Sequence, residues 1–356
     1  MANLRQKILI HLEKNYLDLH LPPFVEKPVE WLEKILYENP AHQTIIEKPI
    51  FIVGCHRSGT TILYETLAQH PDLAYFTNAS SMLPSIPILV NQLMGVVGAD
   101  SASVERFVQD DLAISYSTPS EGIRIWEHLA PVGGDYCLDE TYDNPAMDNY
   151  LKTTIQKHLY HWKKSRFLNK NPDNSVRIRY LNKLFPDAYF IHIIRDGRAV
   201  CHSLLKFRQA AAQFFGSEHR HATSGVKVKA WDHIQTYWQT KPVVAIGLLW
   251  REIIETLERD QQAIDPHRYL QVRYEDVVGD PLISLQKMIE FCQLAWDPHI
   301  QTQMTQAAQK LSLGQRNDAW KQKLSSTEIE QLIDIIGSKM LEYGYNLDPL
   351  VKGSLS

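Results

Sequence analysis

Cysteine is scarce and scattered in this chain of 356 residues. The four cysteines, Cys55, Cys137, Cys201 and Cys292, form no Cys-x-x-Cys pair. The sequence therefore indicates neither a zinc site nor a disulfide framework, and thiols of this kind are typical of a reducing compartment. The first residues lead into an amphipathic segment rather than an unbroken apolar run, so we expect no signal peptide and a cytoplasmic protein.

The chain also lacks a strong excess of charge of either sign. Its 37 Lys and Arg residues nearly balance 41 Asp and Glu residues, and the formal net charge is −4. This balance gives no electrostatic case for nucleic acid or an anionic membrane surface as the main partner. A local basic pocket could still hold a small anion.

Charge is absent altogether between residues 73 and 99. A transmembrane helix needs ~20 mostly apolar residues, but Pro84, Pro87 and several polar residues interrupt this stretch. We therefore expect no integral membrane segment. Two interpretations stay open: the stretch is buried core, or it forms an apolar wall over an acceptor pocket.

One lysine is missing from an otherwise recognisable loop. Residues 49–53 form a short apolar run, Gly54 and Gly59 bracket a tight loop, and apolar residues then recur at helical spacing. A strand, a glycine loop and a helix N-terminus form an anion cradle, because N–H groups converge there and the helix dipole adds positive potential. The Gly-x4-Gly spacing matches a phosphate-binding P-loop, but Thr60 and Thr61 stand where Lys-Ser/Thr is expected. The loop therefore disfavours ATP or GTP hydrolysis and favours another phosphate-bearing donor.

Three further segments predict the other strands of a sheet. They cover residues 166–170, residues 188–194, which form a continuous apolar run, and residues 269–273, and helical patterns follow them. Strands that alternate with helices predict an α/β fold: a P-loop-containing, doubly wound, mainly parallel sheet flanked by helices, with helical insertions.

The predicted sheet is one main domain. We assign it residues 49–348 and expect residues 1–48 to form a helical extension that packs on it. Within the main domain the regular pattern breaks down, and we interpret residues 205–247 as an insertion that covers the substrate.

Residues with anion-binding chemistry follow the predicted strands. Because ligands bind outside the carboxyl ends of such strands, we expect loop 54–61, Lys170, Arg195 and the turn at Tyr274 to share one edge. Ser203 lies about two helical turns after Arg195, so both could contact one anion. With the lysine-less loop, this pair implies a donor that carries two separated anionic groups.

A nucleotide with a 5′-phosphosulfate and a 3′-phosphate has that distribution of charge. Here the sequence resembles the sulfotransferase superfamily, which uses 3′-phosphoadenylyl sulfate (PAPS). Arg-Ser-Gly-Thr-Thr at residues 57–61 resembles the 5′-phosphosulfate loop, and Arg195 and Ser203 match the Arg and Ser of the 3′-phosphate site. Asn-Lys-Asn-Pro at 169–172 and Leu-Phe-Pro-Asp at 184–187 are similar to the bacterial branch related to tyrosylprotein sulfotransferases.

The resemblance implies metal-free, in-line transfer of a sulfuryl group from PAPS to a hydroxyl or amine of an acceptor, which leaves adenosine 3′,5′-bisphosphate. It implies that Arg57 and Lys170 stabilise the bridging and sulfuryl oxygens, as positioning and charge neutralisation do in phosphoryl transfer. The donor-binding residues that it implies are His56, Arg57, Ser58, Gly59, Thr60, Thr61, Arg195, Ser203, Tyr274, Gln315 and Arg316.

The general base departs from the family pattern. Tyrosylprotein sulfotransferases carry a glutamate shortly after the loop helix, where this chain has Thr77 and Asn78, and neither can act as a base. This departure argues against a tyrosyl-peptide acceptor. Glu121 resembles a Pro-x-Glu feature of bacterial members and is the first candidate, with His128 as the second. An ordinary exposed or salt-bridged glutamate also accounts for Glu121.

Three functions stay open at this point. The first is a PAPS-dependent sulfotransferase with a small-molecule or lipid-like acceptor. The second is a P-loop kinase for a small metabolite, which the missing lysine disfavours. The third is a nucleotide-binding protein that has the fold but lacks catalysis.

Overall fold

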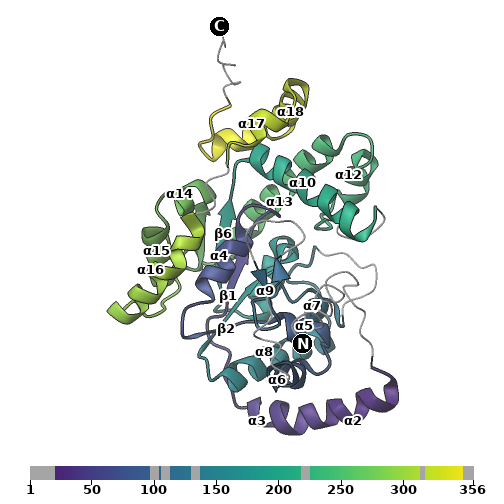
Figure 1. Cartoon of the computed structure of the whole chain (residues 1–356), viewed down its shortest axis with the longest axis vertical. Coiled ribbons are helices and arrows are strands. Elements are labelled where there is room, and N and C mark those ends of the chain that lie inside the picture. Colours follow the sequence, from purple (N-terminus) through teal and green to yellow (C-terminus); the bar gives the residue numbers. More distant parts are fainter. Residues whose placement is uncertain are drawn as a thin grey trace.

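A five-stranded sheet forms the centre of the molecule, with the strand order β2-β5-β1-β6-β7 (Figure 1). The computed structural model describes residues 21–96, 104–105, 113–129, 137–217, 225–312 and 317–347. The strands are β1 (Ile50–Val53), β2 (Leu73–Ala74), β5 (Arg166–Lys170), β6 (Tyr189–Ile194) and β7 (Tyr269–Arg273). All pairings in this sheet are parallel, which confirms the predicted α/β class.

The strands β1, β5, β6 and β7 coincide with the four segments predicted as strands from the sequence. Strand β2 was not predicted. It pairs with β5 through Leu73 opposite Arg166 and Ala74 opposite Phe167. A strand of two residues is too short to show an alternating pattern, so the sequence signal for it is weak.

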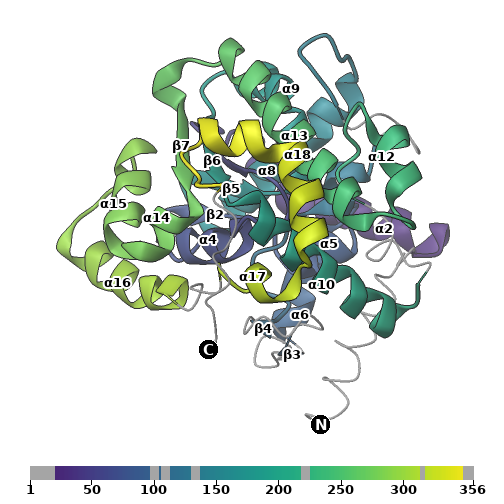
Figure 2. The same cartoon turned by 90° about the horizontal axis from the view of Figure 1, so that it is seen from above.

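Alternate residues of each strand face opposite sides of the sheet. In β1, Phe51 and Val53 belong to one apolar cluster, whereas Ile50 and Ile52 belong to another. The first face is covered by α8 (Pro145–Trp162), α9 (Ile178–Leu184), α10 (Gly197–Phe215), α12 (Trp231–Tyr237), α13 (Pro242–Asp260), α17 (Trp320–Lys323) and α18 (Ser326–Glu342). The second is covered by α4 (Thr60–Leu67), α14 (Tyr274–Gly279), α15 (Pro281–Phe291) and α16 (Pro298–Ser312) (Figure 2). Helices cover both faces of the sheet, as predicted for a doubly wound fold, and the central strands β1 and β6 are buried throughout.

The chain between β2 and β5 carries several short elements. They are α5 (Asn78–Met82), α6 (Pro87–Val96), β3 (Val104–Glu105), β4 (Ala113–Ile114) and α7 (Ile123–Glu127). Ile86, Ile88 and Val90 are buried, whereas the side chain of Val96 is 85% exposed. The first part of the uncharged stretch is therefore core, and its residues 97–99 lie outside the described residues. Within the described parts of the chain, no helix has the length and apolarity needed to cross a bilayer.

The N-terminal elements pack beside α6 and α8 through a buried carboxylate. They are α2 (Pro23–Glu33), η1 (Lys34–Glu38) and α3 (Asn39–Ala41). Glu33 forms an ion pair with Lys157 at 3.0 Å and accepts hydrogen bonds from the amides of Ile88 and Leu89. Residues 1–20 of the predicted helical extension lie outside the described residues, and the boundary at residue 48 stays a prediction.

Regular helix occupies both ends of the predicted insertion. Helix α10 continues to Phe215, and α13 begins at Pro242, because proline is favoured at the first helical position. Helix α12 lies between them, and Trp238 at its end packs 3.5 Å from the guanidinium of Arg208 on α10, measured to the ring centroid. That this region covers a substrate stays a prediction.

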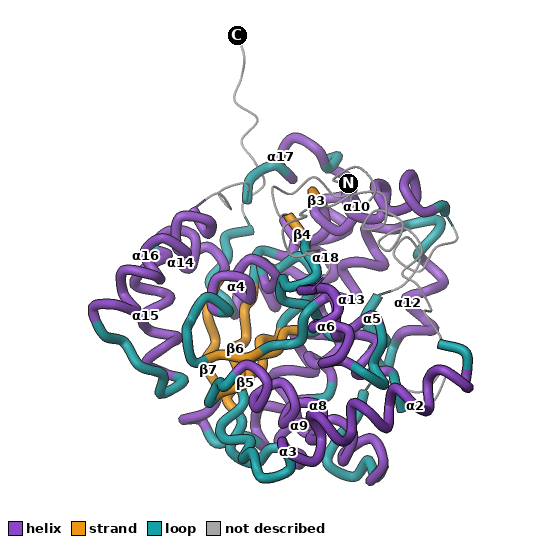
Figure 3. Tube along the Cα trace, turned by 60° about the horizontal axis from the view of Figure 1, so that its bottom comes forward, coloured by secondary structure: helices purple, strands orange, loops and turns teal. Residues whose placement is uncertain are grey.

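Three short 3-10 helices complete the described elements: η3 (Pro172–Val176), η4 (Gln261–Ala263) and η5 (Pro266–Arg268). The tube view shows β5, β6 and β7 within the central sheet with helices around them, and β3 and β4 apart from this sheet (Figure 3). No disulfide joins the four cysteines.

Candidate functional site

The carboxyl ends of the central strands lie together at one edge of the sheet. Parallel pairing sets Ile52 opposite Lys170 on one side and Val53 opposite His192 on the other. Strand β7 continues the edge, with Ile194 opposite Arg273. The loop after β1, Lys170, Arg195 and Tyr274 therefore leave the sheet at the same edge.

The two glycines of the loop are required by close contacts. Gly54 has a φ of +144°, and a Cβ there would lie 2.4 Å from the carbonyl oxygen of Ile193. Gly59 has a φ of +89°, and a Cβ there would lie 2.3 Å from the ring of Tyr274. Ser175 holds the loop from the other side, because its hydroxyl accepts from the Gly54 amide at 2.9 Å and donates to the Gly54 carbonyl at 3.1 Å.

Arg57 connects the loop to both parts of the predicted 3′-phosphate site. Its backbone is left-handed, with a φ of +63°, which is uncommon outside glycine and is often found at functional sites. Its Nε donates to Ser203 Oγ at 3.1 Å, and its guanidinium lies 5.6 Å from the ring centroid of Phe207. Its carbonyl oxygen accepts from Arg195 Nη1 at 2.9 Å.

Arg195 is held in a fixed orientation at the end of β6. Its Nε donates to Asn317 Oδ1 at 2.9 Å, and its guanidinium lies 4.3 Å from the ring centroid of Tyr274. Burial lowers the pKa of Arg195, while nearby groups, Tyr274 and Glu275 foremost, raise it. Arg195 as a whole residue is 9% exposed, so an anion would meet a preorganised and partly desolvated cation.

Lys170 and Glu121 are in direct contact. From the sequence, Lys170 is a candidate for charge stabilisation and Glu121 is the first candidate for the general base. Lys170 Nζ donates to Glu121 Oε1, and the two side chains are 2% and 35% exposed. Hydrogen bonds from Tyr64 to the carbonyl of Ser120 and from Asn169 to the carbonyl of Glu121 hold the backbone that carries the carboxylate. The pair agrees both with a base beside a cation and with an ordinary ion pair.

Several buried polar atoms at this edge have no hydrogen-bond partner among the described residues: His56 Nδ1, Ser58 Oγ and Asn171 Nδ2. Burial lowers the pKa of His56 to about 4, against an opposing effect of Glu121. The imidazole is therefore neutral near pH 7. Because buried polar groups are normally paired, these atoms indicate capacity for a ligand.

Thr60 and Thr61 form the first turn of α4. Gly59 caps this helix in a left-handed conformation, Thr60 is 3% exposed and Thr61 is partly exposed. The loop therefore leads directly into a helix N-terminus, as an anion cradle requires.

His128 lies apart from these groups. It is exposed at the end of α7, and its ring centroid is 4.7 Å from that of Tyr150. Partial desolvation by the surrounding protein atoms lowers the pKa of His128, Glu26 raises it, and Arg124 and Lys157 lower it further. None of these neighbours belongs to the loop or to the Lys170–Glu121 pair, whereas His56 does respond to that pair.

Two predicted donor-binding residues, Gln315 and Arg316, lie outside the described residues. Their neighbour Asn317 contacts Arg195, and sequence reasoning missed it although it continues the same segment. Ser175 and Phe207 were missed as well. The spacing of Phe207, one helical turn after Ser203, is a signal that could have identified it.

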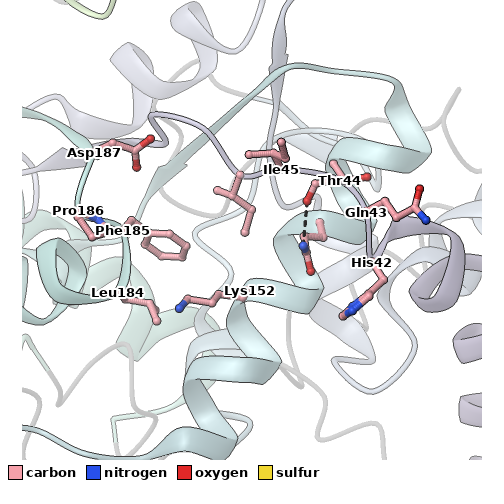
Figure 4. A pocket seen from close by; sticks show the side chains of 11 residues that line it. His42, Gln43, Thr44, Ile45, Lys152, Leu184, Phe185, Pro186 and Asp187 are labelled. Atoms are coloured by element: carbon pink, nitrogen blue, oxygen red, sulfur yellow. Dashed lines mark hydrogen bonds between the residues drawn. The ribbon is translucent and has the colours of Figure 1, made fainter.

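A cavity of about 330 Å³ lies at the opposite edge of the sheet (Figure 4). It is bordered by the segments that precede β1 and β6 and by α8, where Gln156 donates to the carbonyl of Thr44 at 2.8 Å. None of the predicted site residues lines it. This cavity is therefore separate from the candidate site.

Comparison with known proteins agrees with this geometry. A sequence profile described as "Sulfotransferase family" matches residues 49–298. The omega-hydroxy-beta-dihydromenaquinone-9 sulfotransferase Stf3 of Mycobacterium bovis is 26% identical over 277 residues, 72% of this chain and 66% of that protein. Protein-tyrosine sulfotransferase 1 of Danio rerio is 24% identical over 296 residues, 82% of this chain and 67% of that protein. The chain thus spans about two thirds of the length of these relatives.

The fold has a counterpart among solved structures. Sulfotransferase STF9 from Mycobacterium avium superimposes with a TM-score of 0.57 at 16% identity, over 96% of this chain and 91% of that one. At this identity the likeness concerns the fold alone. The sequence profile, in contrast, runs from β1 to the start of α16 and so includes every strand of the sheet. This chain therefore belongs to the sulfotransferase family, a family of enzymes.

Proposed function

We propose that this chain transfers the sulfuryl group of PAPS to a hydroxyl or amine of an apolar, lipid-like acceptor and releases adenosine 3′,5′-bisphosphate. The observation that carries the proposal is the double connection of Arg57. Its side chain bonds Ser203 at 3.1 Å, and its carbonyl oxygen bonds Arg195 at 2.9 Å. Two anion-binding elements are thereby joined at a fixed separation, which suits a donor with anionic groups at its 5′ and 3′ positions.

In this proposal the glycine loop holds the 5′-phosphosulfate. The N-terminus of α4 and the loop amides supply positive potential, and the unpaired Ser58 Oγ supplies a further hydrogen bond. Thr60 and Thr61 lie in the first helical turn, where P-loops place hydroxyls near phosphate. Arg195 and Ser203 take the 3′-phosphate.

The chemical step needs charge neutralisation and one proton acceptor. The acceptor oxygen or nitrogen forms a bond to sulfur, the bond from sulfur to the bridging oxygen breaks, and the bisphosphate leaves with that electron pair. Lys170 and Arg57 stabilise the negative charge on the bridging and sulfuryl oxygens. Glu121 takes the proton of the acceptor. Its protonation neutralises the carboxylate beside Lys170, so the lysine charge is then directed to the leaving group.

The backbone that carries Glu121 is connected to the uncharged stretch of the sequence. Ser120 and Ser81 are joined by a hydrogen bond of 2.9 Å between their hydroxyls, and Arg124 donates to the carbonyl of Met82. The end of α5, within the uncharged stretch, thus borders the backbone that carries Glu121. The name of the relative Stf3 identifies a menaquinone derivative as the molecule that protein acts on. A quinol or long-chain alcohol is accordingly the first acceptor class to try.

Thermal unfolding with nucleotides tests the proposal against its alternatives. A ligand at 100 times its Kd raises the stability of the folded state by about 2.7 kcal/mol. Adenosine 3′,5′-bisphosphate should raise the Tm, and ATP with magnesium should not. The opposite result would indicate a small-metabolite kinase.

Turnover then separates an enzyme from a binding protein of the same fold. Purified protein is incubated with PAPS and a panel that includes a quinol, a long-chain alcohol and a tyrosyl peptide. Sulfated quinol or alcohol supports the proposal, and turnover of the peptide alone overturns the acceptor class. Tight bisphosphate binding without turnover of any acceptor would indicate a nucleotide-binding protein that lacks catalysis.

A further inference from the structure

A hydrogen-bonded relay lies behind Arg195 and reaches residues far along the chain. We infer that Glu275, Asn317 and Tyr345 are positioning residues that fix Arg195 and thereby give the donor site its selectivity for a 3′-phosphate. The inference rests on the proposed function, because it assigns a mechanism to the 3′-phosphate site. Asn317 and Tyr345 lie beyond residue 298, where the match to the family profile ends.

Asn317 links Arg195 to Glu275 through both ends of its side-chain amide. Its Oδ1 accepts from Arg195 Nε at 2.9 Å, and its Nδ2 donates to Glu275 Oε1 at 2.8 Å. A guanidinium can only donate and an ionised carboxylate can only accept, so the orientation of the amide is determined by its partners. Asn317 therefore transmits the position of Glu275 to Arg195.

Glu275 is itself held by two other segments of the chain. Its Oε1 also accepts from the backbone amide of Asp196 at 3.1 Å, and its Oε2 accepts from the hydroxyl of Tyr345 at 2.8 Å. Burial and the neighbouring Glu275 carboxylate raise the pKa of Tyr345, so this hydroxyl stays protonated and donates. The guanidinium of Arg273 lies 4.4 Å from the ring centroid of Tyr345 and keeps the ring in place.

The relay determines how Arg195 meets an anion. Nε is committed to Asn317 and Nη1 to the carbonyl of Arg57, while Tyr274 stacks on the guanidinium. The plane of the guanidinium is therefore set before a ligand arrives, which removes part of the entropic cost of binding. A 3′-phosphate gains from this preorganisation, and a nucleotide without one does not.

The C-terminal elements bring the relay to the sheet edge. Helices α17 and α18 lie beside α10, the helix that follows Arg195 (Figure 1). Asn317 precedes α17 and Tyr345 follows α18. The residues after the profile match thus complete a site whose other parts lie within the match.

Calorimetric titration with two nucleotides tests the relay. We expect Asn317→Ala and Tyr345→Phe each to raise the Kd for adenosine 3′,5′-bisphosphate about tenfold, since one net hydrogen bond corresponds to roughly that factor. The Kd for adenosine 5′-monophosphate, which lacks the 3′-phosphate, should stay unchanged. Tyr343→Phe is the matched control, because the hydroxyl of Tyr343 also donates to a glutamate, Glu258, at 2.8 Å.

A double-mutant cycle separates positioning from general support of the fold. If Asn317 acts through Arg195, then Asn317→Ala should add little to the effect of Arg195→Lys. Tyr345→Phe keeps the buried ring, so it remains informative if Asn317→Ala does not fold. The inference is overturned if the ratio of the two dissociation constants is unchanged in the variants, whether both affinities stay the same or both fall by the same factor. If the unaltered protein does not prefer the bisphosphate, the proposed function fails instead.

Discussion

Arg195 Nη1 donates a hydrogen bond to the backbone carbonyl oxygen of Arg57 at 2.9 Å, across 138 positions of sequence. The bond joins the end of β6 to the middle of the glycine loop. The backbone of Arg57 is left-handed, with φ at +63°, and its carbonyl oxygen accepts this bond. The two motifs that the sequence presents separately therefore form one unit in the structure.

Replacing Arg195 should weaken donor binding more than turnover. Arg195→Ala removes the contact to the loop and a charged donor, and hydrogen bonds to charged groups contribute ~1.5–3 kcal/mol, or about 10- to 100-fold in Kd. Calorimetric titration with adenosine 3′,5′-bisphosphate measures this change. Arg251→Ala, which removes a partly exposed arginine of α13, is the control and should bind normally. Unchanged affinity in Arg195→Ala would rule out the proposed 3′-phosphate site.

Replacing Lys170 should have the opposite signature. Lys170→Ala removes the cation that we propose stabilises the leaving group, and the loss of one such preorganised donor lowers kcat about 10²- to 10³-fold. The partner Glu121 is 35% exposed, so water can solvate the carboxylate that is left and the fold should persist. Single-turnover kinetics and donor titration separate the two effects. A raised donor Kd with unchanged kcat would contradict this role for Lys170.

Much of the fold was predictable because strands covered on both faces are rich in apolar residues. Every residue of β6 (189–194) is buried, and five of its six side chains are accordingly apolar or aromatic, which is the pattern that predicted this strand. β2 escaped prediction because its two residues carry no periodicity, and its position is determined by pairing with β5.

The site was predictable where it follows strands and less so where it depends on distant partners. Lys170 and Arg195 directly end or follow strands, so topology alone indicated their edge. The contact of Lys170 with Glu121 crosses 49 positions, and that of Arg195 with Asn317 crosses 122. No local spacing encodes such contacts. They depend on how the helices pack, which a single sequence does not state.

Gly59 should be irreplaceable because of its contact with Tyr274, and this effect can be separated from backbone strain. Gly59→Ala places a Cβ 2.3 Å from the ring of Tyr274 and also keeps a residue at a φ of +89°. Gly216→Ala is the control for backbone strain without a clash, because Gly216 has a φ of +104° and a ψ of 152° but nothing within 4 Å of the added carbon. A residue with a side chain in such a sparsely populated backbone conformation costs roughly 1–3 kcal/mol.

We therefore expect Gly216→Ala to lower the Tm modestly and to bind the bisphosphate normally. Gly59→Ala should lose at least about tenfold in bisphosphate affinity, the equivalent of ~1.4 kcal/mol, because Tyr274 also supports Arg195. Equal behaviour of the two variants in thermal unfolding and titration would show that the contact with Tyr274 has no role.

A buried histidine in the sheet should make stability depend on pH. His192 Nδ1 lies 2.9 Å from the hydroxyl of Tyr269, and burial lowers the pKa of His192 to about 3. The unfolded chain binds this proton with a pKa of about 6.5. Since the folded pKa lies below the unfolded one, the stability is complete above about pH 6.5 and is lost as the pH falls toward the folded pKa.

Urea unfolding at pH 7 and pH 5 measures this contribution. Between these values the linkage of one such histidine amounts to about 2 kcal/mol of unfolding free energy. His192→Gln removes the titrating group, so the difference in stability between the two pH values should shrink by that amount, whatever its effect at pH 7. His267→Gln, at an exposed position in η5, should leave the difference unchanged. If His192→Gln loses as much stability between pH 7 and pH 5 as the unaltered protein does, the imidazole is not kept neutral by the fold.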